Sequence, residues 1–339
     1  MHMADALLSP AVGGVMCAVS AGAVAVAAAK IKKDHLDEKK IPMMGVMGAF
    51  VFAAQMINFT IPGTGSSGHI GGGILLASIL GEFPGLLAIT AVLLIQTLFF
   101  ADGGLLALGC NVFNMGVVMC LLAYPLLFKP IVRKGFTKKR IFAASIVSVV
   151  LGLQAGAFCV VLETLASGVT ELPFGAFVAL MQPIHLAIGA VEGVITGAVL
   201  CFVYQMRPEI LESANDGTAI GKSVSMKRVL LSFAVLAVLI GGGLSLAASS
   251  NPDGLEWSIA GVTGGTELEA EGGVYDAAAE LQQSVAILPD YDYRNAGEDG
   301  SATGTTVSGL VGGAMVLAVS GIAGAAIYWV KRRKKQGVS

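Results

Sequence analysis

Nine long apolar runs, separated by short polar segments, dominate the chain. A helix rises about 1.5 Å per residue, so about 20 apolar residues cross the roughly 30 Å hydrocarbon core of a membrane. The pattern therefore predicts an all-α fold, a polytopic membrane helical bundle of seven spans followed by a two-span hairpin with an extracytoplasmic loop. The predicted spans are residues 8–29, 42–61, 69–82, 84–101, 104–128, 141–166, 183–206, 229–249 and 307–330.

The third run, residues 69–82, is too short to cross a membrane upright. It contains Gly71, Gly72 and Gly73, which indicate a broken or partly re-entrant element. Irregular backbone at membrane depth is tolerated only where it is buried inside the protein. We therefore expect this run to lie in the interior of the bundle, and we count it as one crossing.

The basic residues indicate the orientation of the spans. Four clusters, at 30–40, 129–140, 207–228 and 331–335, hold all of the lysines and arginines except Arg294. If the nine spans alternate in direction, all four clusters lie on the same side, which the positive-inside rule makes cytoplasmic. We expect a multi-pass protein of the cytoplasmic membrane, with an extracytoplasmic N-terminus and a cytoplasmic C-terminus.

Composition agrees with a membrane protein, since 55% of the residues are hydrophobic and only 13% are charged. Charge is concentrated in the predicted extracytoplasmic loop 250–306, which has eleven acidic residues and one arginine. This excess of negative charge argues against a nucleic-acid partner. The five cysteines stand singly inside predicted spans, as is typical of small apolar packing residues.

We divide the chain into a seven-span module, residues 1–206, a cytoplasmic linker, 207–228, and a two-span module, 229–339. The linker is polar and has no apolar periodicity. Its segment GTAIGKS, residues 217–223, resembles a phosphate-binding loop but has three residues, where the pattern needs four, between its first glycine and the Gly-Lys pair. We therefore expect no phosphate-binding loop and no ATPase activity on this chain.

Three of the four histidines, His2, His69 and His185, fall at the extracytoplasmic ends of predicted spans, together with Asp102. A single histidine in a membrane protein is more often a hydrogen-bonded core residue than a ligand. Several ionisable groups at one end of a bundle instead indicate a functional site, because their burial is costly.

His2 is positioned to chelate a metal ion together with the chain terminus. The Met1 amine, the His2 backbone nitrogen and the His2 imidazole can close a five-membered and a six-membered ring, which gives three nitrogens in one plane. Ni²⁺ and Cu²⁺ prefer such square-planar nitrogen sets. The neutral imidazole of His69 is the natural fourth donor.

Further polar residues are candidates to orient these ligands and to balance their charge. His185 and Glu192 are seven residues apart, so they lie on one face of a helix, with Glu192 roughly 10 Å deeper. Asn58, Asp102 and Asn111 complete the group. For Glu192 and Asn111, a purely structural network between helices is an equally good interpretation.

A different pattern marks the first span, where Ala21, Ala25 and Ala29 recur every four residues. Such a smooth stripe lets another helix approach closely. The stripe predicts either packing against the chain's own helices or the docking of a partner helix.

Several motifs of the chain, in this order and spacing, resemble the CbiM/NikM family, the substrate-binding subunits of nickel and cobalt energy-coupling factor (ECF) transporters. The resemblance covers residues 1 to about 210. The remainder resembles the small CbiN/NikN component, so the whole looks like a fused, MN-type chain. The motifs are MHMADALLSP, GTGSSGHIGGG, FFADGGLLALGCNVFNMG and PIHLAIGAVEGVITG for the first part, and NPDGLEWS and LPDYDY for the second.

The resemblance implies that Met1, His2 and His69 bind the transported Ni²⁺ or Co²⁺, and that the protein has no resident cofactor. It also implies work with a transmembrane coupling subunit (the T component) and ATP-binding A components, with the alanine stripe as the docking surface. The ion would feed nickel enzymes or cobalamin synthesis. One departure is Ala6, where the family usually has glycine, which puts the bend of the first segment in question.

Two alternative functions fit the residues less well. A membrane zinc metalloenzyme would use His69, His185 and Glu192, but the chain lacks an HExxH motif and this function leaves His2 unexplained. A passive cation channel is disfavoured because a tight planar chelate would hold an ion too long to conduct it. The acidic loop could gather cations or regulate their loading, and the choice between nickel and cobalt stays open.

Overall fold

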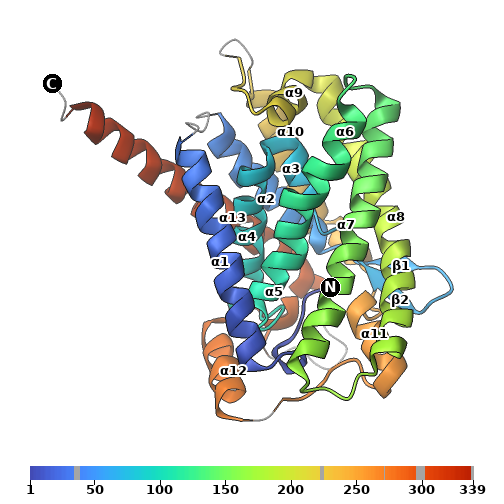
Figure 1. The fold of residues 1–339 in the computed structure, drawn as a ribbon. Helices are drawn as coiled ribbons and strands as arrows, with labels where there is room; N and C mark the ends of the chain where they lie inside the picture. The colour runs from blue at the N-terminus through green and yellow to red at the C-terminus, as the bar shows by residue number, and fades with distance from the viewer. Residues whose placement is uncertain (34–38, 222–224, 271, 295–301, 337–339) are drawn as a thin grey trace.

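The computed structural model describes residues 1–33, 39–221, 225–270, 272–294 and 302–336 as a bundle of helices with one small hairpin (Figure 1). The first module, residues 1–206, contains η1 (Asp5–Leu7), α1 (Pro10–Lys33), α2 (Lys40–Gln55), β1 (Phe59–Ile61), β2 (Ser66–Gly68), α3 (Gly73–Leu80), α4 (Glu82–Phe99), α5 (Leu108–Val112), the π-helical stretch η2 (Phe113–Phe128), α6 (Lys129–Val132), α7 (Lys138–Ser167) and α8 (Phe174–Met206). The linker contains α9 (Pro208–Asp216), and the second module contains α10 (Lys227–Gly242), η3 (Leu244–Ala247), α11 (Gly254–Thr263), α12 (Gly273–Val285), η4 (Pro289–Tyr291) and α13 (Ala302–Gln336).

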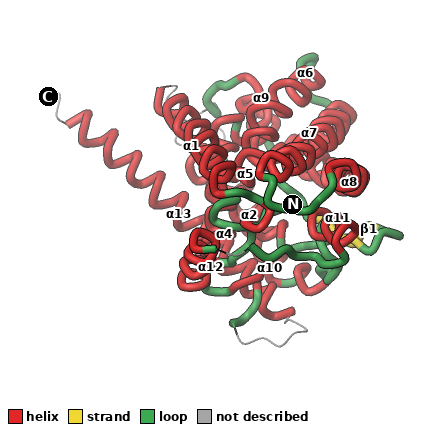
Figure 2. Tube along the Cα trace, turned by 60° about the horizontal axis from the view of Figure 1, so that its bottom comes forward, coloured by secondary structure: helices red, strands yellow, loops and turns green. Residues whose placement is uncertain are grey.

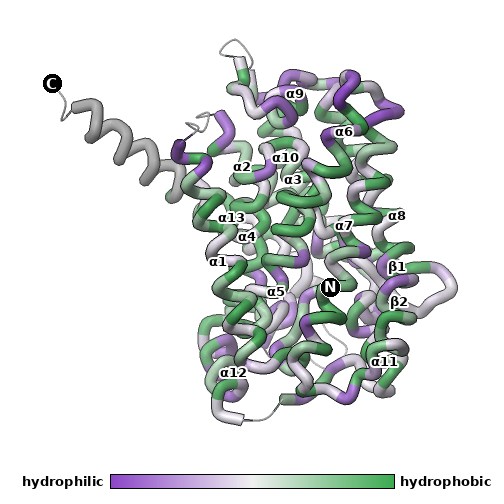
Figure 3. Tube along the Cα trace, in the orientation of Figure 1, coloured by the Kyte–Doolittle hydropathy of each residue, from purple (hydrophilic) through white to green (hydrophobic). Residues whose placement is uncertain are grey.

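The long helices have the composition of membrane spans. Figure 3 shows hydrophobic residues along the middle of the bundle and hydrophilic residues gathered towards its ends. Many large apolar side chains on the outer faces are exposed, as expected where lipid rather than water surrounds the helices. Within the described residues, six stretches are long and apolar enough to cross a membrane: Pro10–Lys33, Glu82–Phe99, Leu108–Val132, Lys138–Ser167, Phe174–Met206 and Thr303–Ile322.

Three of the nine predicted spans do not form full-length helices in the structure. α2 and α10 have 16 residues each, about 24 Å of helix, and α3 has only 8, about 12 Å. Every residue of α3 is buried, which agrees with an interior, broken element. The stretch between α2 and α3 is non-helical because it forms the β1–β2 hairpin and the glycine-rich turn before α3.

The hairpin pairs β1 and β2 antiparallel, with Phe59 opposite Gly68 and Ile61 opposite Ser66. Small residues in β2 allow it to lie directly on α8, since a Cβ atom at Gly68 would come within 2.7 Å of the Ile188 side chain. On β2, the Ser67 N–H donates to the carbonyl of Pro252, which belongs to the second module and lies 2.8 Å away. The hairpin therefore connects the two modules.

The second module packs along the first. α10 and α13 lie against α2, and α11 lies against α8. α12 covers the ends of α1 and α4, where the Tyr275 hydroxyl donates to the Leu8 carbonyl and Gln282 donates to the carbonyls of Thr97 and Gly103. The acidic loop thus consists largely of ordered helices docked on the first module.

The predicted linker is more structured than its composition indicated. α9 buries Ile210 and Leu211 and packs against α3 and α8, so the expectation of no apolar periodicity is wrong for residues 208–216. Gly217, with φ 66°, ends this helix. The loop resembling a phosphate-binding motif therefore begins at a helix end, and its residues 222–223 lie outside the described part of the chain.

The two ends of the bundle differ in structure. α6 and α9 lie at one end, and α11 and α12 lie at the other (Figure 1). Figure 2, a view turned towards the second end, shows the N-terminus in the middle of the bundle with helices around it. The N-terminal segment and the docked loop of the second module consequently meet at the same place.

Candidate metal-binding site

The first residues are held firmly as they enter the bundle. The Asp5 carboxylate accepts the N–H groups of Leu106 and Ala107 at 2.8 and 3.0 Å, in the turn directly before the N-terminus of α5. An acidic side chain is favourable at a helix N-terminus. Ala6 lies within η1 with ordinary backbone angles, so this position does not need glycine and the bend forms with alanine.

Asn111 holds the next part of the segment in an extended conformation. Its side-chain oxygen accepts the Met3 N–H at 2.8 Å, and its amide group donates to the Met3 carbonyl at 3.2 Å. The Gly104 N–H donates to the same carbonyl at 2.9 Å. Because the backbone of Met3 is paired on both sides, Met1 and His2 point into the interior.

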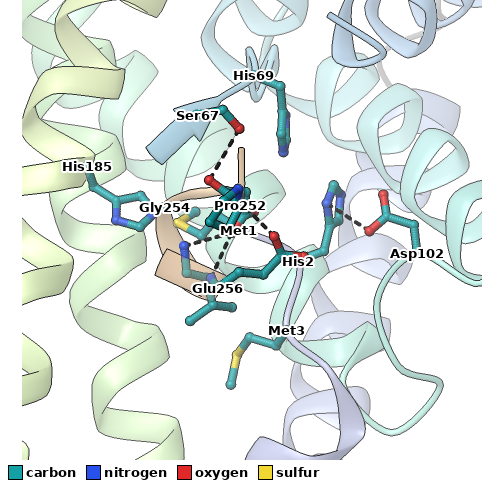
Figure 4. Close-up of polar contacts among 12 residues, drawn as sticks. Met1, His2, Met3, Ser67, His69, Asp102, His185, Pro252, Gly254 and Glu256 are labelled. Carbon is teal, nitrogen blue, oxygen red and sulfur yellow. Dashed lines mark hydrogen bonds and ion pairs between the residues drawn. The ribbon is translucent and has the colours of Figure 1, made fainter. Parts of the chain in front are cut away.

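The His2 and His69 imidazoles stack on each other, with ring centroids 5.3 Å apart and an interplanar angle of 14° (Figure 4). His69 Nδ1 lies 3.0 Å from the Ile70 carbonyl. A carbonyl only accepts hydrogen bonds, so Nδ1 carries the proton and Nε2 keeps the lone pair that a metal requires. His2 Nδ1 lies 3.3 Å from an oxygen of Asp102.

The loop that carries His69 is positioned by two buried polar residues. Glu192 accepts the Gly72 N–H at 2.9 Å, and Gln55 donates to the Gly71 carbonyl at 3.1 Å. Gly72 has φ 79°, a conformation that suits glycine. Gln96 in turn donates to Gln55 at 2.8 Å. Glu192 therefore acts on the backbone next to His69 and does not reach the imidazoles.

The Met1 amine forms an ion pair with Asp253, which belongs to the PDGLE motif of the second module. Asp253 also begins α11, where its carboxylate accepts the Leu255 and Glu256 N–H groups at 2.7 and 3.0 Å. Glu256 completes a capping box by accepting the Asp253 N–H at 2.8 Å. One carboxylate thus fixes both the start of α11 and the start of the chain.

Gly254 lets α11 approach the site closely. A Cβ atom at this position would lie 2.8 Å from Ile188 Cδ1 and 3.0 Å from His185 Cε1, so a larger residue would push α11 away from α8. His185 Nδ1 lies 2.8 Å from the Met181 carbonyl, within its own helix. His185 and Met1 line a cavity of about 20 Å³, which has room for about one water.

Burial and neighbouring charges set the protonation of the groups outside the spans. Burial would raise the pKa of Asp253, but the Met1 amine and the α11 N–H groups outweigh it and hold that pKa well below its usual value. Burial and the nearby Asp253 raise the pKa of Glu256 to about 7. Burial lowers the pKa of His2, which favours the neutral imidazole that binds metals.

The second module also reaches His2 indirectly. The Tyr291 hydroxyl donates to the carboxylate of Asp102, which faces His2. The Tyr291 ring stacks on Phe100, with ring centroids 5.2 Å apart and an interplanar angle of 23°. The Asp290 N–H donates to the Phe100 carbonyl at 2.7 Å. Within the described residues, the three non-glycine positions with positive φ, Ala101, Asp290 and Tyr291, all lie at this contact.

The structure brings Met1, His2, His69, Asp102 and His185 together around the N-terminus, as Figure 4 shows. Asn111 and Glu192 do not touch these groups. Asn111 holds the backbone of Met3, and Glu192 holds the backbone of Gly72. The Asn58 carbonyl accepts the Ser249 N–H at 2.7 Å, and this residue lines an outer cavity.

Sequence reasoning missed Asp253, Tyr291, Gln55 and Gln96. Asp253 lies in the motif NPDGLEWS and Tyr291 in LPDYDY. No spacing along the chain, however, relates either residue to residue 1. Within the described part of the chain, no cluster of three or more His, Cys, Asp or Glu residues is suited to hold a metal. A chelate built on amine and backbone nitrogens would not produce such a cluster.

Buried nitrogen donors at one end of a multi-pass helical bundle define a membrane protein that handles a metal ion. Comparison with known families agrees. The chain belongs to the CbiM family, the "Cobalt uptake substrate-specific transmembrane region", which matches residues 2–210, and a PDGLE domain matches residues 227–328.

Relatives share this two-part organisation. The putative fused nickel transport protein NikMN of Archaeoglobus fulgidus is 32% identical, and the alignment covers 94% of this chain and 96% of that protein. The fused nickel transport protein NikMN of Rhodobacter capsulatus is 30% identical, with coverage of 95% and 96%. The crystal structure of a truncated transition metal transporter is 30% identical, with a TM-score of 0.54, and covers 61% of this chain and 99% of its own.

These relatives are metal transporters, and the chain is a transport protein rather than an enzyme. The alternative of a zinc metalloenzyme is not supported. Glu192 accepts the backbone N–H of Gly72, and among the described residues His69, His185 and Glu192 do not form a group that could hold one metal ion.

Proposed function

We propose that this chain is the substrate-specific subunit for high-affinity uptake of Ni²⁺ or Co²⁺ across the cytoplasmic membrane. The ion is held by the Met1 amine, the His2 backbone nitrogen, His2 Nδ1 and His69 Nε2. The names of the relatives, nickel and cobalt transport proteins, support this choice of substrate.

The observation that carries the proposal is the convergence of residues 1, 2 and 69 in one buried place. Met1 is only 6% exposed, and the His2 ring lies against His69. Chelation through His2 Nδ1 requires this nitrogen to exchange Asp102 for the ion. The His2 ring then carries its proton on Nε2. Likewise, the Met1 ammonium group releases one proton to solvent and exchanges Asp253 for the ion, and both carboxylates then remain beside it.

Charge balance supports the same arrangement. Square-planar nitrogen chelation of a divalent ion removes the proton from the His2 backbone amide, so the chelate carries a net charge of about +1. A buried charge of this kind needs a partner of opposite charge. Asp102 and Asp253 supply that charge from the two modules.

ATP hydrolysis by separate A components, transmitted by a T component, powers the uptake in this proposal. Ala21, Ala25 and Ala29 are all exposed on α1, so the chain's own helices leave the stripe open to a coupling subunit. We place the end of the bundle that holds α6 and α9, next to the basic clusters 129–140 and 207–228, in the cytoplasm and the N-terminus outside. In that arrangement the chain crosses the membrane seven times and then forms a two-span hairpin, with the stretches around α2, α3 and α10 completing the shorter crossings.

The test is titration of the purified full chain with Ni²⁺ and Co²⁺ by calorimetry. We expect one ion per chain, and loss of that binding in His2→Ala and in a variant with one extra residue before Met1, because the cavity beside Met1 is too small for an added residue. The control is Ser9→Ala, a half-buried position at the far end of the same segment. Stoichiometric binding by either altered protein would contradict the proposal.

A further inference from the structure

A second, larger cavity lies outside the imidazole pair, between the two modules. We call it the chamber. Its volume is about 480 Å³, and His2 and His69 line its inner wall. Five carboxylates line it as well: Asp102, Asp253, Glu256, Asp290 and Asp292. The chamber therefore lies next to the N-terminal nitrogen donors and takes acidic groups from both parts of the chain.

The chamber is large enough for a cation that keeps its water. Six waters at roughly 30 Å³ each occupy about 180 Å³, well below the volume of the chamber. The carboxylates are not arranged to bind an ion directly, since no group of three or more potential ligands is close enough among the described residues. Contact through bound water is the interaction that this spacing allows.

The walls of the chamber are rich in hydrogen-bond acceptors. Gln96 Oε1 belongs to a fully buried side chain, and the His2 side chain is 8% exposed. Within the described part of the chain, neither Gln96 Oε1 nor His2 Nε2 has a hydrogen-bond partner. When His2 Nδ1 donates its proton to Asp102, His2 Nε2 is an acceptor. The Gln96 side chain also interacts with the His2 ring, and either acceptor that finds no donor inside the protein can accept one from a ligand in the chamber.

The electrostatic field of the chamber favours cations. No lysine or arginine side chain lines it among the described residues, and Arg294 instead donates to the carbonyls of Gln283 and Ala286. Clefts lined by one sign of charge concentrate ions of the opposite sign and raise their association rates. Waters bound to a cation donate only O–H groups outward, so they match walls made of carboxylate, amide and imidazole acceptors.

We propose that the chamber binds a hydrated divalent cation through its water shell, before the ion loses water to the N-terminal nitrogens. This inference rests on the proposed function for the destination of the ion. Residues of the second module, above all Asp290, form the outer wall of the chamber. The two modules together therefore create a binding site that neither forms alone.

The decisive probe is hexaamminecobalt(III), whose six ammonia ligands do not exchange and whose N–H groups resemble those of bound water. Ni²⁺ loading of the purified full chain is followed by stopped-flow absorbance at constant ionic strength. We expect the probe to slow loading competitively at least threefold, and to leave Ni²⁺ that is already bound in place. An unchanged loading rate would overturn the proposal.

Asp290→Asn tests the outer wall with little backbone risk, because asparagine tolerates the φ of 50° at this position. We expect Ni²⁺ to load about 3- to 10-fold more slowly, with less inhibition by the probe and an unchanged stoichiometry. The matched control is Glu280→Gln, which removes the same charge from an exposed position of α12 that does not line the chamber. Equal slowing in both variants would show a general charge effect and refute the chamber.

Failure of the chamber can be separated from failure of the proposed function. If the unaltered chain binds no Ni²⁺, the proposed function is wrong, and equilibrium dialysis with hexaamminecobalt(III) still tests the chamber. One probe per chain, weakened by Asp290→Asn and not by Glu280→Gln, would support it. Absence of probe binding, or equal binding by both variants, would refute it whatever Ni²⁺ does.

Discussion

Asn111→Ala tests whether the N-terminal segment must be seated before it can chelate an ion. The change leaves the buried Met3 N–H without a partner, which costs about 1–3 kcal/mol, and it removes one further hydrogen bond, to the Met3 carbonyl, worth about 0.5–1.5 kcal/mol. The Met3 carbonyl keeps the Gly104 N–H. The free energy that holds the N-terminal segment in its bound position should therefore fall by about 2–4 kcal/mol.

This loss corresponds to Ni²⁺ binding that is about 30- to 1000-fold weaker, since about 1.4 kcal/mol is tenfold in an equilibrium constant. Competition calorimetry on the purified chain measures it. Asn215→Ala is the control, because this asparagine bonds only to its neighbour Asp216 among the contacts described, at the exposed end of α9. A folded Asn111→Ala protein that binds Ni²⁺ within threefold of the unaltered chain would refute the reasoning.

Three further outcomes are expected. Gly254→Ala should destabilise the protein by about 1–3 kcal/mol through overpacking against α8, seen as a lower unfolding temperature, whereas Gly265→Ala, where the new Cβ makes ordinary contact at 3.7 Å, should not. Ni²⁺ at 100 times its Kd should stabilise the unaltered chain by about 2.7 kcal/mol, and His2→Ala should lose that gain. The pKa of Asp253 is held low, so the contribution of its carboxylate to the free energy of unfolding should be complete above about pH 4 and disappear only in stronger acid. Denaturant unfolding of the unaltered chain and of Asp253→Asn measures this contribution as the difference between their free energies of unfolding. A difference that disappears between pH 7 and 5 would contradict this reasoning.

The candidate ligands followed from the sequence because their chemistry is local. The Met1 amine, the His2 amide and the His2 imidazole are joined by covalent bonds, so their ability to form fused chelate rings needs no knowledge of the fold. His69 was added from topology alone, as another histidine at the same end of a span. The stacking of its ring on His2 agrees with that reasoning.

The contribution of the second module could not be predicted in the same way. Asp253 is 252 residues from Met1, and their ion pair depends on where α11 docks on α8 and on the hairpin. Tyr291 reaches Asp102 only because its loop supplies N–H groups to the carbonyl end of α4. Such contacts arise from unsatisfied backbone groups at helix ends, which carry no sequence pattern that identifies their partner.

The residue pattern alone is enough to establish an α-helical membrane protein in two modules with nitrogen donors at its N-terminus. Hydrophobic length and covalent chemistry fix those properties within short stretches of chain. Three features become visible only in the folded chain: α3 is a short buried helix, a hairpin interrupts the second and third runs, and the acidic loop folds back over the N-terminus. These features depend on long-range packing, where glycines such as Gly68 and Gly254 permit close approach and buried polar groups find partners far along the chain.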